Sequence, residues 1–483
     1  MKTFLIVLLA VIGIIILLLV IAAIRAAAIK AKPYTGEEKA LFTPDEEAKY
    51  ANALSEMIKV PTVSKPEGAD KSEFYKLHAK LKELFPLIHE KLEMTDIDGN
   101  VIYRWKGKDS SKDAILLMGH QDVVPASEKG WEHGPFSGDI EGGKIHGRGA
   151  MDCKCTVMAE MAAVEELLEE GFEPERDVYL SFASNEEISG GGAEKLVSYL
   201  EQKGVRLCIA MDEGGAIVEN VFPGMSALCA AVGIVEKGTV NIKFTAKGNG
   251  GHSSTPPSDN PIARLSAFVC DIEKKNHFKT GITPPVERML SSLAPYLTFP
   301  MRLIFGNLWL FKPLLNVAMP KFSPMAKAFV TTTVVFTQGA GSDAPNVIPG
   351  EAYLIANMRV GTLQTRDECV EILRKAAEKY DIETEPLMGF DASRVTDPDS
   401  DEMKYLEKCV HEVFPSYCFA PYYMNGGTDC RHYQSVTDNC VRFTPILMDN
   451  SQLAAMHSVN ENIGTAAVAS GVKFYKYFIK NHQ

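Results

Sequence analysis

The sequence lacks the cysteine spacing of a structural zinc site and of a disulfide framework. Ten cysteines occur along 483 residues, but Cys153 and Cys155 form the only close pair, as Cys-x-Cys rather than Cys-x-x-Cys. We therefore expect most of the cysteines to be buried free thiols.

An excess of basic residues is also missing. The formal net charge is −12, and without a basic face a protein cannot neutralise phosphates, so nucleic acid is excluded as a partner. The composition, 46% hydrophobic and 23% charged, is that of a globular protein and excludes wholesale disorder. The chain is too long for one core and predicts two domains with additional segments.

One uninterrupted apolar run is present, from Phe4 to Ile24. It is long enough to cross a bilayer as one helix and longer than the apolar part of a signal peptide, so we expect a transmembrane anchor over residues 1–30; the alanines at 26–28 leave cleavage as an alternative. Basic residues flank the run on both sides, so the positive-inside rule does not decide the orientation. The unpaired cysteines favour a reducing compartment. Because such a segment more often precedes an exported domain, we expect a single-pass membrane protein whose folded part is extracytoplasmic.

The rest of the chain divides by pattern. Strand-like apolar runs at 100–105, 114–118, 178–183 and 207–211 alternate with helical stretches at 155–170 and 193–202, which predicts a mixed, mainly parallel α/β sheet. After residue 221, strands at 226–235, 239–246, 330–338 and 351–360 and helices at 261–275 and 366–380 fit a small inserted α+β layer. We expect the larger domain to comprise residues 31–222 and 363–483, and the insertion residues 223–362.

The stretch Met118-Gly-His-Gln-Asp-Val-Val-Pro125 carries the first candidate site residues. It follows a short apolar run typical of a strand buried on both faces. Side chains at i and i+2 of an extended segment point the same way, so His120 and Asp122 share a face. A carboxylate in that position can orient an imidazole that binds a metal.

Five further candidates follow along the chain. Each lies at a strand end or beside a helix start, which is where open α/β sheets place their sites. Asp152 follows a glycine-rich turn, and Glu186 and Glu187 follow the strand at 178–183. Asp212 ends the next strand, and His457 precedes the last helix. Two histidines and four carboxylates suit a dinuclear zinc site, in which one carboxylate can bridge metals about 3.5–4 Å apart.

Several motifs, in order along the chain, resemble one family. They are Met118-Gly-His-Gln-Asp122, Gly147-Arg-Gly-Ala-Met-Asp-Cys-Lys154, Asn185-Glu-Glu187, Met211-Asp-Glu-Gly-Gly215 and the late His457, together with Gly251-His-Ser-Ser-Thr255, Asn346-Val-Ile-Pro349 and Gly426-Gly-Thr-Asp429. The chain is similar to the aminoacylase and carboxypeptidase S family of dinuclear zinc metallopeptidases, nearest the branch of N-fatty-acyl-amino-acid synthase/hydrolases.

The resemblance implies a role for each metal-site residue. Asp152 would bridge two Zn²⁺ ions per subunit, His120 and Asp212 would complete one zinc site, and Glu187 and His457 the other. Glu186 would be the general base that takes a proton from a metal-bridging water, Asp122 would orient His120, and the peptide bond between Asp152 and Cys153 would be cis. Glu213 follows Asp212 directly and is the alternative ligand; we expect Asp212 because it is nearer the strand end.

The fold and the substrate contacts are implied in the same way. The family has a zinc-exopeptidase catalytic domain with an inserted ferredoxin-like lid and dimerisation domain. His252 would reach the site from that inserted domain, often of the partner subunit in a homodimer, to help stabilise the oxyanion. Asn346, Arg359 and Arg431 are candidates for binding the substrate's carboxylate, since arginine binds carboxylates in bidentate fashion.

The implied activity is zinc-dependent hydrolysis of the amide bond in N-acyl amino acids. Two alternatives are a carboxypeptidase or dipeptidase acting on short peptides, and a catalytically silent binding protein of the same fold. The apolar, proline-rich segment 277–327, with Leu308-Trp-Leu-Phe311, is too broken for a second membrane span. We expect it to be either a lid packed on the small domain or the wall of a pocket for a long acyl chain.

Overall fold

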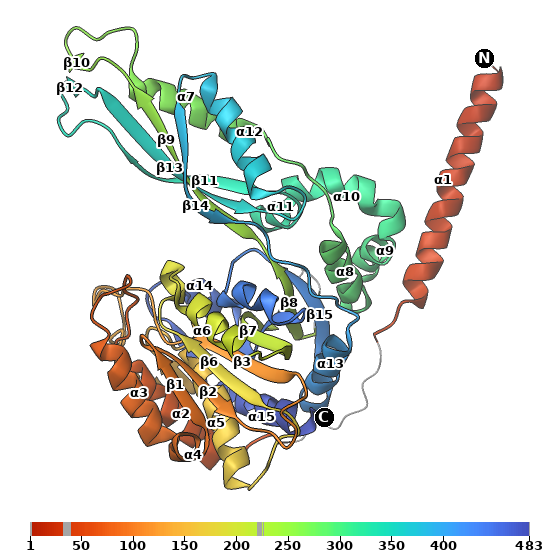
Figure 1. Ribbon diagram of the computed structural model, residues 1–483. Helices are drawn as coiled ribbons and strands as arrows, with labels where there is room; N and C mark the ends of the chain where they lie inside the picture. Colours follow the sequence, from red (N-terminus) through yellow and green to blue (C-terminus); the bar gives the residue numbers. More distant parts are fainter. Residues whose placement is uncertain (1, 32–39, 220–224, 226, 483) are drawn as a thin grey trace.

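The computed structural model describes residues 2–31, 40–219, 225 and 227–482. Figure 1 shows two lobes and one N-terminal helix, most of which projects away from both. The larger lobe contains the N-terminal half of the folded chain and its C-terminal part, and the smaller lobe is formed by the residues between them.

The larger lobe is built on an eight-stranded mixed sheet with the order β1-β2-β6-β3-β7-β16-β8-β15. All residues of β3 (Ala114–His120) are buried, which explains its continuous apolar sequence. It pairs in parallel with β6 (Val178–Ala183) and β7 (Leu207–Val218), so the mixed α/β sheet expected from the sequence is confirmed. The other strands are β1 (Glu93–Ile97), β2 (Asn100–Trp105), β8 (Cys229–Glu236), β15 (Cys418–Met424) and β16 (Cys440–Met448).

Helices cover both faces of this sheet. Ile115 and Leu117 of β3 pack towards α2 (Pro44–Ile58), α5 (Lys154–Glu169) and α15 (Thr465–Asn481). The alternate residues, Leu116 and Met118, pack with α6 (Gly192–Gln202) and the 3₁₀ helix η3 (Asp429–Ser435). Further elements of this lobe are α3 (Ser72–Leu84), α4 (Pro86–Lys91), α13 (Asp401–Val413), α14 (Asn450–Ala455) and the strands β4 (Ile140–Glu141), β5 (Lys144–His146) and β17 (Asn462–Gly464).

The smaller lobe contains a four-stranded antiparallel sheet with the order β11-β13-β9-β14. Its core joins Val240 and Phe244 of the sheet to Phe268 and Leu373 of two helices. The chain runs β-α-β-β-α-β, which is the ferredoxin-like arrangement. The elements are β9 (Gly238–Lys247), α7 (Pro261–Lys274), β11 (Thr333–Ala340), β13 (Glu351–Val360), α12 (Arg366–Glu378) and β14 (Glu383–Phe390).

The extent of this lobe differs from the expected range 223–362. At its start, β8 belongs to the large sheet, and the boundary expected at 222/223 lies outside the described residues. At its end, α12 and β14 belong to the small sheet. The sequence of β14 contains Pro386 and no apolar alternation, so it does not predict a strand. β14 is an edge strand, where proline is tolerated. It is a strand because it pairs with β9.

Two apolar regions lie on one side of the molecule. α1 (Lys2–Ala28) is, among the described residues, the one unbroken helix long and apolar enough to cross a membrane, with a mean hydropathy of 3.7. The segment expected to be broken by proline forms α8 (Pro284–Leu293), α9 (Phe299–Phe305), α10 (Leu308–Phe322) and α11 (Pro324–Val330). Together, α9 and α10 are also long and apolar enough to cross a membrane, but the pair is bent by 97° at the break between them.

Candidate active site

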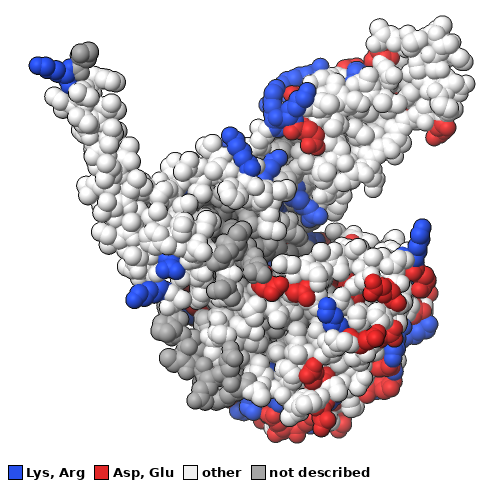
Figure 2. Space-filling model, turned by 180° about the vertical axis from the view of Figure 1, so that it is seen from behind, with Lys and Arg blue, Asp and Glu red and all other residues white. Residues whose placement is uncertain are grey.

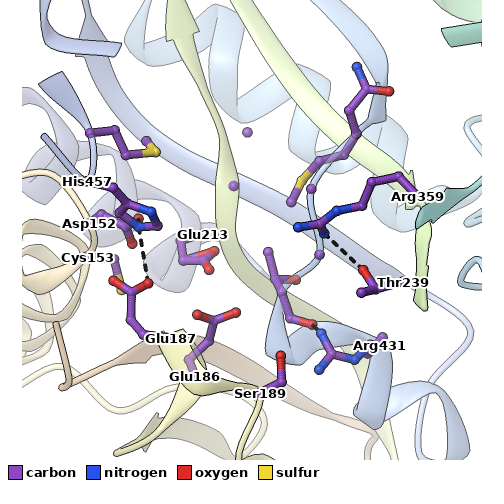
Figure 3. A pocket seen from close by; sticks show the side chains of 18 of the residues that line it. Asp152, Cys153, Glu186, Glu187, Ser189, Glu213, Thr239, Arg359, Arg431 and His457 are labelled. Carbon is purple, nitrogen blue, oxygen red and sulfur yellow. Dashed lines mark hydrogen bonds and ion pairs between the residues drawn. The ribbon is translucent and has the colours of Figure 1, made fainter. Parts of the chain in front are cut away.

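A cavity of about 520 Å³ lies between the two lobes, at the edge of the sheet where β3 and β6 end. The larger lobe contributes Asp152, Glu186, Glu187, Glu213 and His457, and the smaller lobe contributes Thr239, Asn241, Asn357 and Arg359. Figure 3 shows the acidic side chains on one side of the cavity and two arginines on the other.

Asp152 lies between the two predicted histidines. Its Oδ1 is 3.0 Å from His120 Nε2, and its Oδ2 is 3.0 Å from His457 Nε2. His457 Nε2 is also 3.1 Å from Glu187 Oε2. Two groups of potential ligands therefore share Asp152: one with Glu187 and His457, and one with His120 and Cys153, each with its ligand atoms within 4.8 Å of one another.

Asp122 supports this arrangement through its backbone carbonyl and its carboxylate. His120 Nδ1 lies 2.9 Å from the Asp122 carbonyl oxygen, which can only accept, so Nδ1 carries a proton and Nε2 is the nitrogen that faces Asp152. The Asp122 carboxylate accepts hydrogen bonds from the backbone N–H groups of Glu186 and Glu187, both at 3.1 Å, and from Ser64 Oγ at 2.5 Å. It therefore positions both glutamates; Ser64 was not singled out in the sequence.

The glycine-rich turn before Asp152 depends on Glu461. Gly149 has φ +85°, and a Cβ there would lie 2.7 Å from Val123 Cγ1. The buried Glu461 carboxylate accepts from the backbone N–H of Gly149 (3.0 Å) and Met151 (2.9 Å) and pairs with Arg148. Glu461 was not singled out in the sequence, because its role depends on these contacts with a distant turn. The peptide bond from Asp152 to Cys153 is cis, as expected.

The two candidate carboxylates on β7 point differently. Glu213 lines the cavity (Figure 3), whereas Asp212 does not line it. Neighbouring residues of a strand face opposite sides. Asp212 Oδ1 accepts from the backbone N–H of Glu213 at 2.9 Å. The geometry thus favours Glu213, the alternative left open by the sequence, over Asp212.

The carboxylates outnumber the groups that could neutralise them. Burial raises the pKa of Glu186 and of Glu213, and it raises the pKa of Asp212 to about 6. One oxygen of each of Glu187, Asp212 and Glu213 is buried and has no hydrogen-bond partner among the described residues. Unpaired buried carboxylates beside imidazole nitrogens are a donor set that a cation satisfies, and oxygen with nitrogen ligands suits zinc.

Arg359 and Arg431 face these carboxylates across the cavity. Arg359 donates to Thr239 Oγ1 at 3.0 Å, and Arg431 donates to the Thr428 carbonyl at 2.6 Å and stacks 4.2 Å from the Phe390 ring centroid. Neither guanidinium forms an ion pair within the described parts of the chain. Burial and the nearby Arg431 lower the pKa of Arg359. An anionic ligand group would relieve this repulsion.

His252 and Asn346 are absent from the cavity of the same chain. His252 lies on β10 (Gly251–His252), which pairs with β12 (Val347–Ile348), and the Asn346 carbonyl accepts from Ser253 N–H at 3.1 Å. Both side chains are exposed, at the end of the smaller lobe farthest from the larger one (Figure 1). One chain therefore does not bring these two predicted residues to its own site.

The apolar part of the cavity comes from unexpected positions. Its lining includes Met388, Phe390, Tyr422, Met424, Met448, Leu453 and Met456. No described residue of the segment 277–327 lines it, so the expected acyl-pocket wall at Leu308-Trp-Leu-Phe311 is not found there. Instead, α9 packs against α1 and α8 packs against β15, which directs the segment away from the cavity.

Comparison with known proteins places this site in context. Residues 116–481 match peptidase family M20/M25/M40. The chain is 33% identical over 446 residues to an N-fatty-acyl-amino acid synthase/hydrolase of Xenopus tropicalis, covering 90% of this chain and 86% of the relative. It is 33% identical over 451 residues to a probable carboxypeptidase S-like protein of Dictyostelium discoideum, covering 91% and 86%. A solved M20 family metallo-carboxypeptidase from Sulfolobus solfataricus shares the fold, with a TM-score of 0.65, 20% identity and coverage of 89% and 98%.

Proposed function

Since the chain belongs to peptidase family M20/M25/M40, we propose that it is a zinc-dependent hydrolase that cleaves the amide bond of N-acyl amino acids. One observation carries the proposal: the cavity sets a histidine and carboxylate cluster sharing Asp152 opposite two unpaired arginines. Several relatives along most of the chain are N-fatty-acyl-amino acid synthase/hydrolases, which is consistent with a substrate bearing an acyl group and a carboxylate.

The donor set supports two zinc ions per subunit. Asp152 would bridge them, with Glu187 and His457 holding one ion. The other ion would be held by His120, which lies 3.0 Å from Asp152, and by Glu213, which lines the same cavity. Glu213 is preferred to Cys153, because burial raises the pKa of that thiol and its sulfur already accepts from the backbone N–H of His120 at 3.1 Å. Bound zinc would polarise the amide carbonyl and acidify a water molecule.

Glu186 is the proposed general base. It lines the cavity beside the ligands but belongs to neither ligand group, so its carboxylate is free to accept a proton. Its backbone is fixed by Asp122 at 3.1 Å. Burial raises its pKa, and a raised pKa makes the ionised carboxylate a stronger base.

The arginines and methionines would hold the two ends of the substrate. Arg359 and Arg431 would bind the amino-acid carboxylate, for which the planar guanidinium is suited. The four methionines at 388, 424, 448 and 456 would contact the acyl chain, since flexible thioether side chains adapt to apolar ligands of different length.

A substrate panel tests this proposal. Each buried methylene contributes about 0.8 kcal/mol, so four more should raise kcat/KM by roughly two orders of magnitude. Met448→Ser should flatten that trend, whereas Trp309→Ala, outside the cavity, should leave it unchanged. Faster turnover of dipeptides or acetylated amino acids than of long-chain substrates would instead favour a carboxypeptidase or dipeptidase, as the similarity to carboxypeptidase S-like proteins also allows.

The smaller lobe is proposed to act as a lid and as the dimerisation domain. His252 is exposed at its tip and does not line the cavity of its own chain, so it would enter the cavity of the partner subunit in a homodimer and donate to the oxyanion. Asn346, next to it, would act from the same position. α1 would anchor the protein in a membrane as a single span.

A further inference from the structure

The outward face of α10 is apolar. Trp309, Pro313, Val317 and Lys321 are exposed and follow one another at four-residue spacing, so they lie along one stripe of the helix. The side chain of Trp309 is 50% exposed, that of Val317 is 61% exposed, and Leu314 beside them is 64% exposed. A surface helix of a soluble domain normally turns its polar face outward; α10 does the reverse.

The exposed apolar surface extends beyond this helix. Phe322 at the end of α10 is 83% exposed, Met325 of α11 is 61% exposed, and Phe299 of α9 is 48% exposed. No described residue of this chain covers them. A contiguous apolar surface of this kind marks a contact with a partner or a membrane.

The charge of the segment differs from that of the chain. Between Glu287 and Asp343 the sequence contains five basic residues and no acidic one, although the whole chain carries a net charge of −12. Lys321 and Lys327 are exposed and, within the described residues, have no ion-pair partner. Figure 2 shows the acidic side chains mainly over the larger lobe, whereas the surface beside α1 is white with scattered blue.

The same segment is joined to α1. Asn307, at the start of α10, donates to the Ala22 carbonyl at 3.0 Å and accepts from Trp309 Nε1 at 3.1 Å. Arg302 of α9 donates to the Ile29 carbonyl at 3.3 Å. Ala22 and Ala26 are the buried residues of α1, and Figure 1 shows α9 and α10 beside its C-terminal end. The exposed face therefore begins where the apolar helix ends.

We infer that α9, α10 and α11 form a second membrane contact, which lies in the interface of an anionic phospholipid bilayer next to the α1 span. Apolar side chains that enter the acyl boundary, with lysines at their margin, are typical of helices lying in that interface, and lysine side chains near it are attracted to anionic headgroups. An indole at headgroup depth is common in membrane proteins. This contact would fix how the cavity faces the bilayer, which a single span alone leaves free to rotate.

Trp309 provides a direct test. The chain has three tryptophans, of which Trp105 is buried in the large lobe. The full chain, with residues 1–31 intact by mass, is inserted into vesicles of phosphatidylcholine and phosphatidylglycerol that carry a doxyl quencher near the headgroup. We expect quenching of the tryptophan emission, loss of most of that quenching in Trp309→Phe, and no loss in the matched control Trp131→Phe. An equal quenched fraction in Trp309→Phe and the parent would overturn the inference.

The charge contribution is tested separately. Lys321→Glu with Lys327→Glu should reduce the quenching of Trp309 in vesicles containing phosphatidylglycerol, and the difference from the parent should shrink in pure phosphatidylcholine. Lys112→Glu with Lys129→Glu changes the net charge equally on the larger lobe and should have no effect.

If Trp309 is protected from quencher and the chains instead cross-link through this face to a second copy, the surface is a protein interface and the inference is wrong. Amide-hydrolase activity in detergent should be the same in all these variants, which separates a folding defect from a lost contact.

Discussion

At the scale of single residues, two adjacent glutamates of the site differ in their contacts although their side chains are the same. Glu187 Oε2 lies 3.1 Å from His457 Nε2, whereas Glu186 belongs to neither ligand group, although Asp122 accepts from the backbone of both. Glu186→Gln should therefore keep the zinc content of the parent and lower kcat by roughly 10²–10⁴-fold, the usual contribution of general-base catalysis. Zinc analysis of the purified variant beside steady-state kinetics tests this; a lost zinc ion would make Glu186 a ligand instead.

The pair Asp212 and Glu213 gives a second residue-scale prediction. Because Glu213 points into the cavity and Asp212 does not line it, Glu213→Gln should remove one of the two zinc ions. Asp212→Asn should retain both, since its amide oxygen can still accept from the backbone N–H of residue 213. Metal content after dialysis against a weak chelator distinguishes the two variants. The reverse result would restore Asp212 as the ligand, as expected from the sequence.

At the scale of elements, the turn that opens α5 is held by a residue more than 300 positions away. Glu461 accepts from Gly149 and Met151 and neutralises Arg148, and it is fully buried. Glu461→Gln would leave the Arg148 charge without a counter-ion and loosen the position of Asp152. Changes behind metal ligands typically cost about 10–100-fold in metal affinity, so we expect a loss of that size, measured by competition with a chromogenic chelator.

The control for this prediction is Glu165→Gln. The buried Glu165 carboxylate accepts from the backbone N–H groups of Leu87 and Ile88, both at 2.9 Å, and does not line the cavity, so its loss should affect thermal stability without changing zinc affinity. If Glu461→Gln lowers stability to the same extent but binds zinc like the parent, Glu461 supports the fold and not the metal site.

At the scale of the whole molecule, the carboxylate cluster links metal binding to stability. Without cations, burial raises the pKa of Asp212 from 3.8 to about 6 and raises that of Glu213. A group whose pKa is higher in the folded state stabilises the fold below its unfolded pKa, and that contribution is lost as the pH rises through the folded value. The metal-free protein should therefore lose stability between about pH 4 and pH 6.

Thermal unfolding with and without a strong chelator measures this effect. The difference in Tm between the zinc-loaded and metal-free protein should widen as the pH rises across that interval, because zinc neutralises the carboxylates only when they are ionised. A difference that is constant with pH would mean that burial does not raise the pKa of these carboxylates in the metal-free protein.

The position of His252 leads to a prediction about assembly. It is exposed at the tip of the smaller lobe and does not line its own cavity. If it acts in the partner's cavity, mixed dimers of His252→Ala and Glu186→Gln chains contain one site with both residues intact, so mixing the two inactive variants should restore activity. Subunit exchange followed by native mass spectrometry serves as the control; hybrids that form without activity would place the complete site within one chain.

The sequence by itself determined much of this protein. The continuous apolar run of β3, the helical spacing of α5 and the polar residues at the strand ends predicted a mixed α/β sheet with His120, Asp152, Glu186, Glu187 and His457 at one edge. Such features are local: burial on both faces requires an apolar run, and side chains at strand ends meet at one edge because the strands are parallel. The N-terminal apolar run is likewise a local feature, because its length and composition alone predict a membrane span.

Only the tertiary structure decided the rest, because those features depend on distant contacts. β14 is a strand through its pairing with β9, despite Pro386. The proposal of Glu213 in place of Asp212 rests on which face of β7 meets the cavity, and the contact of Glu461 with the turn before Asp152 spans more than 300 residues. The apolar segment around Trp309 was expected to be either a lid packed on the small domain or the wall of an acyl pocket. Hydrophobicity predicts that such a segment has a contact but not which surface provides it. In the structure the segment contacts α1.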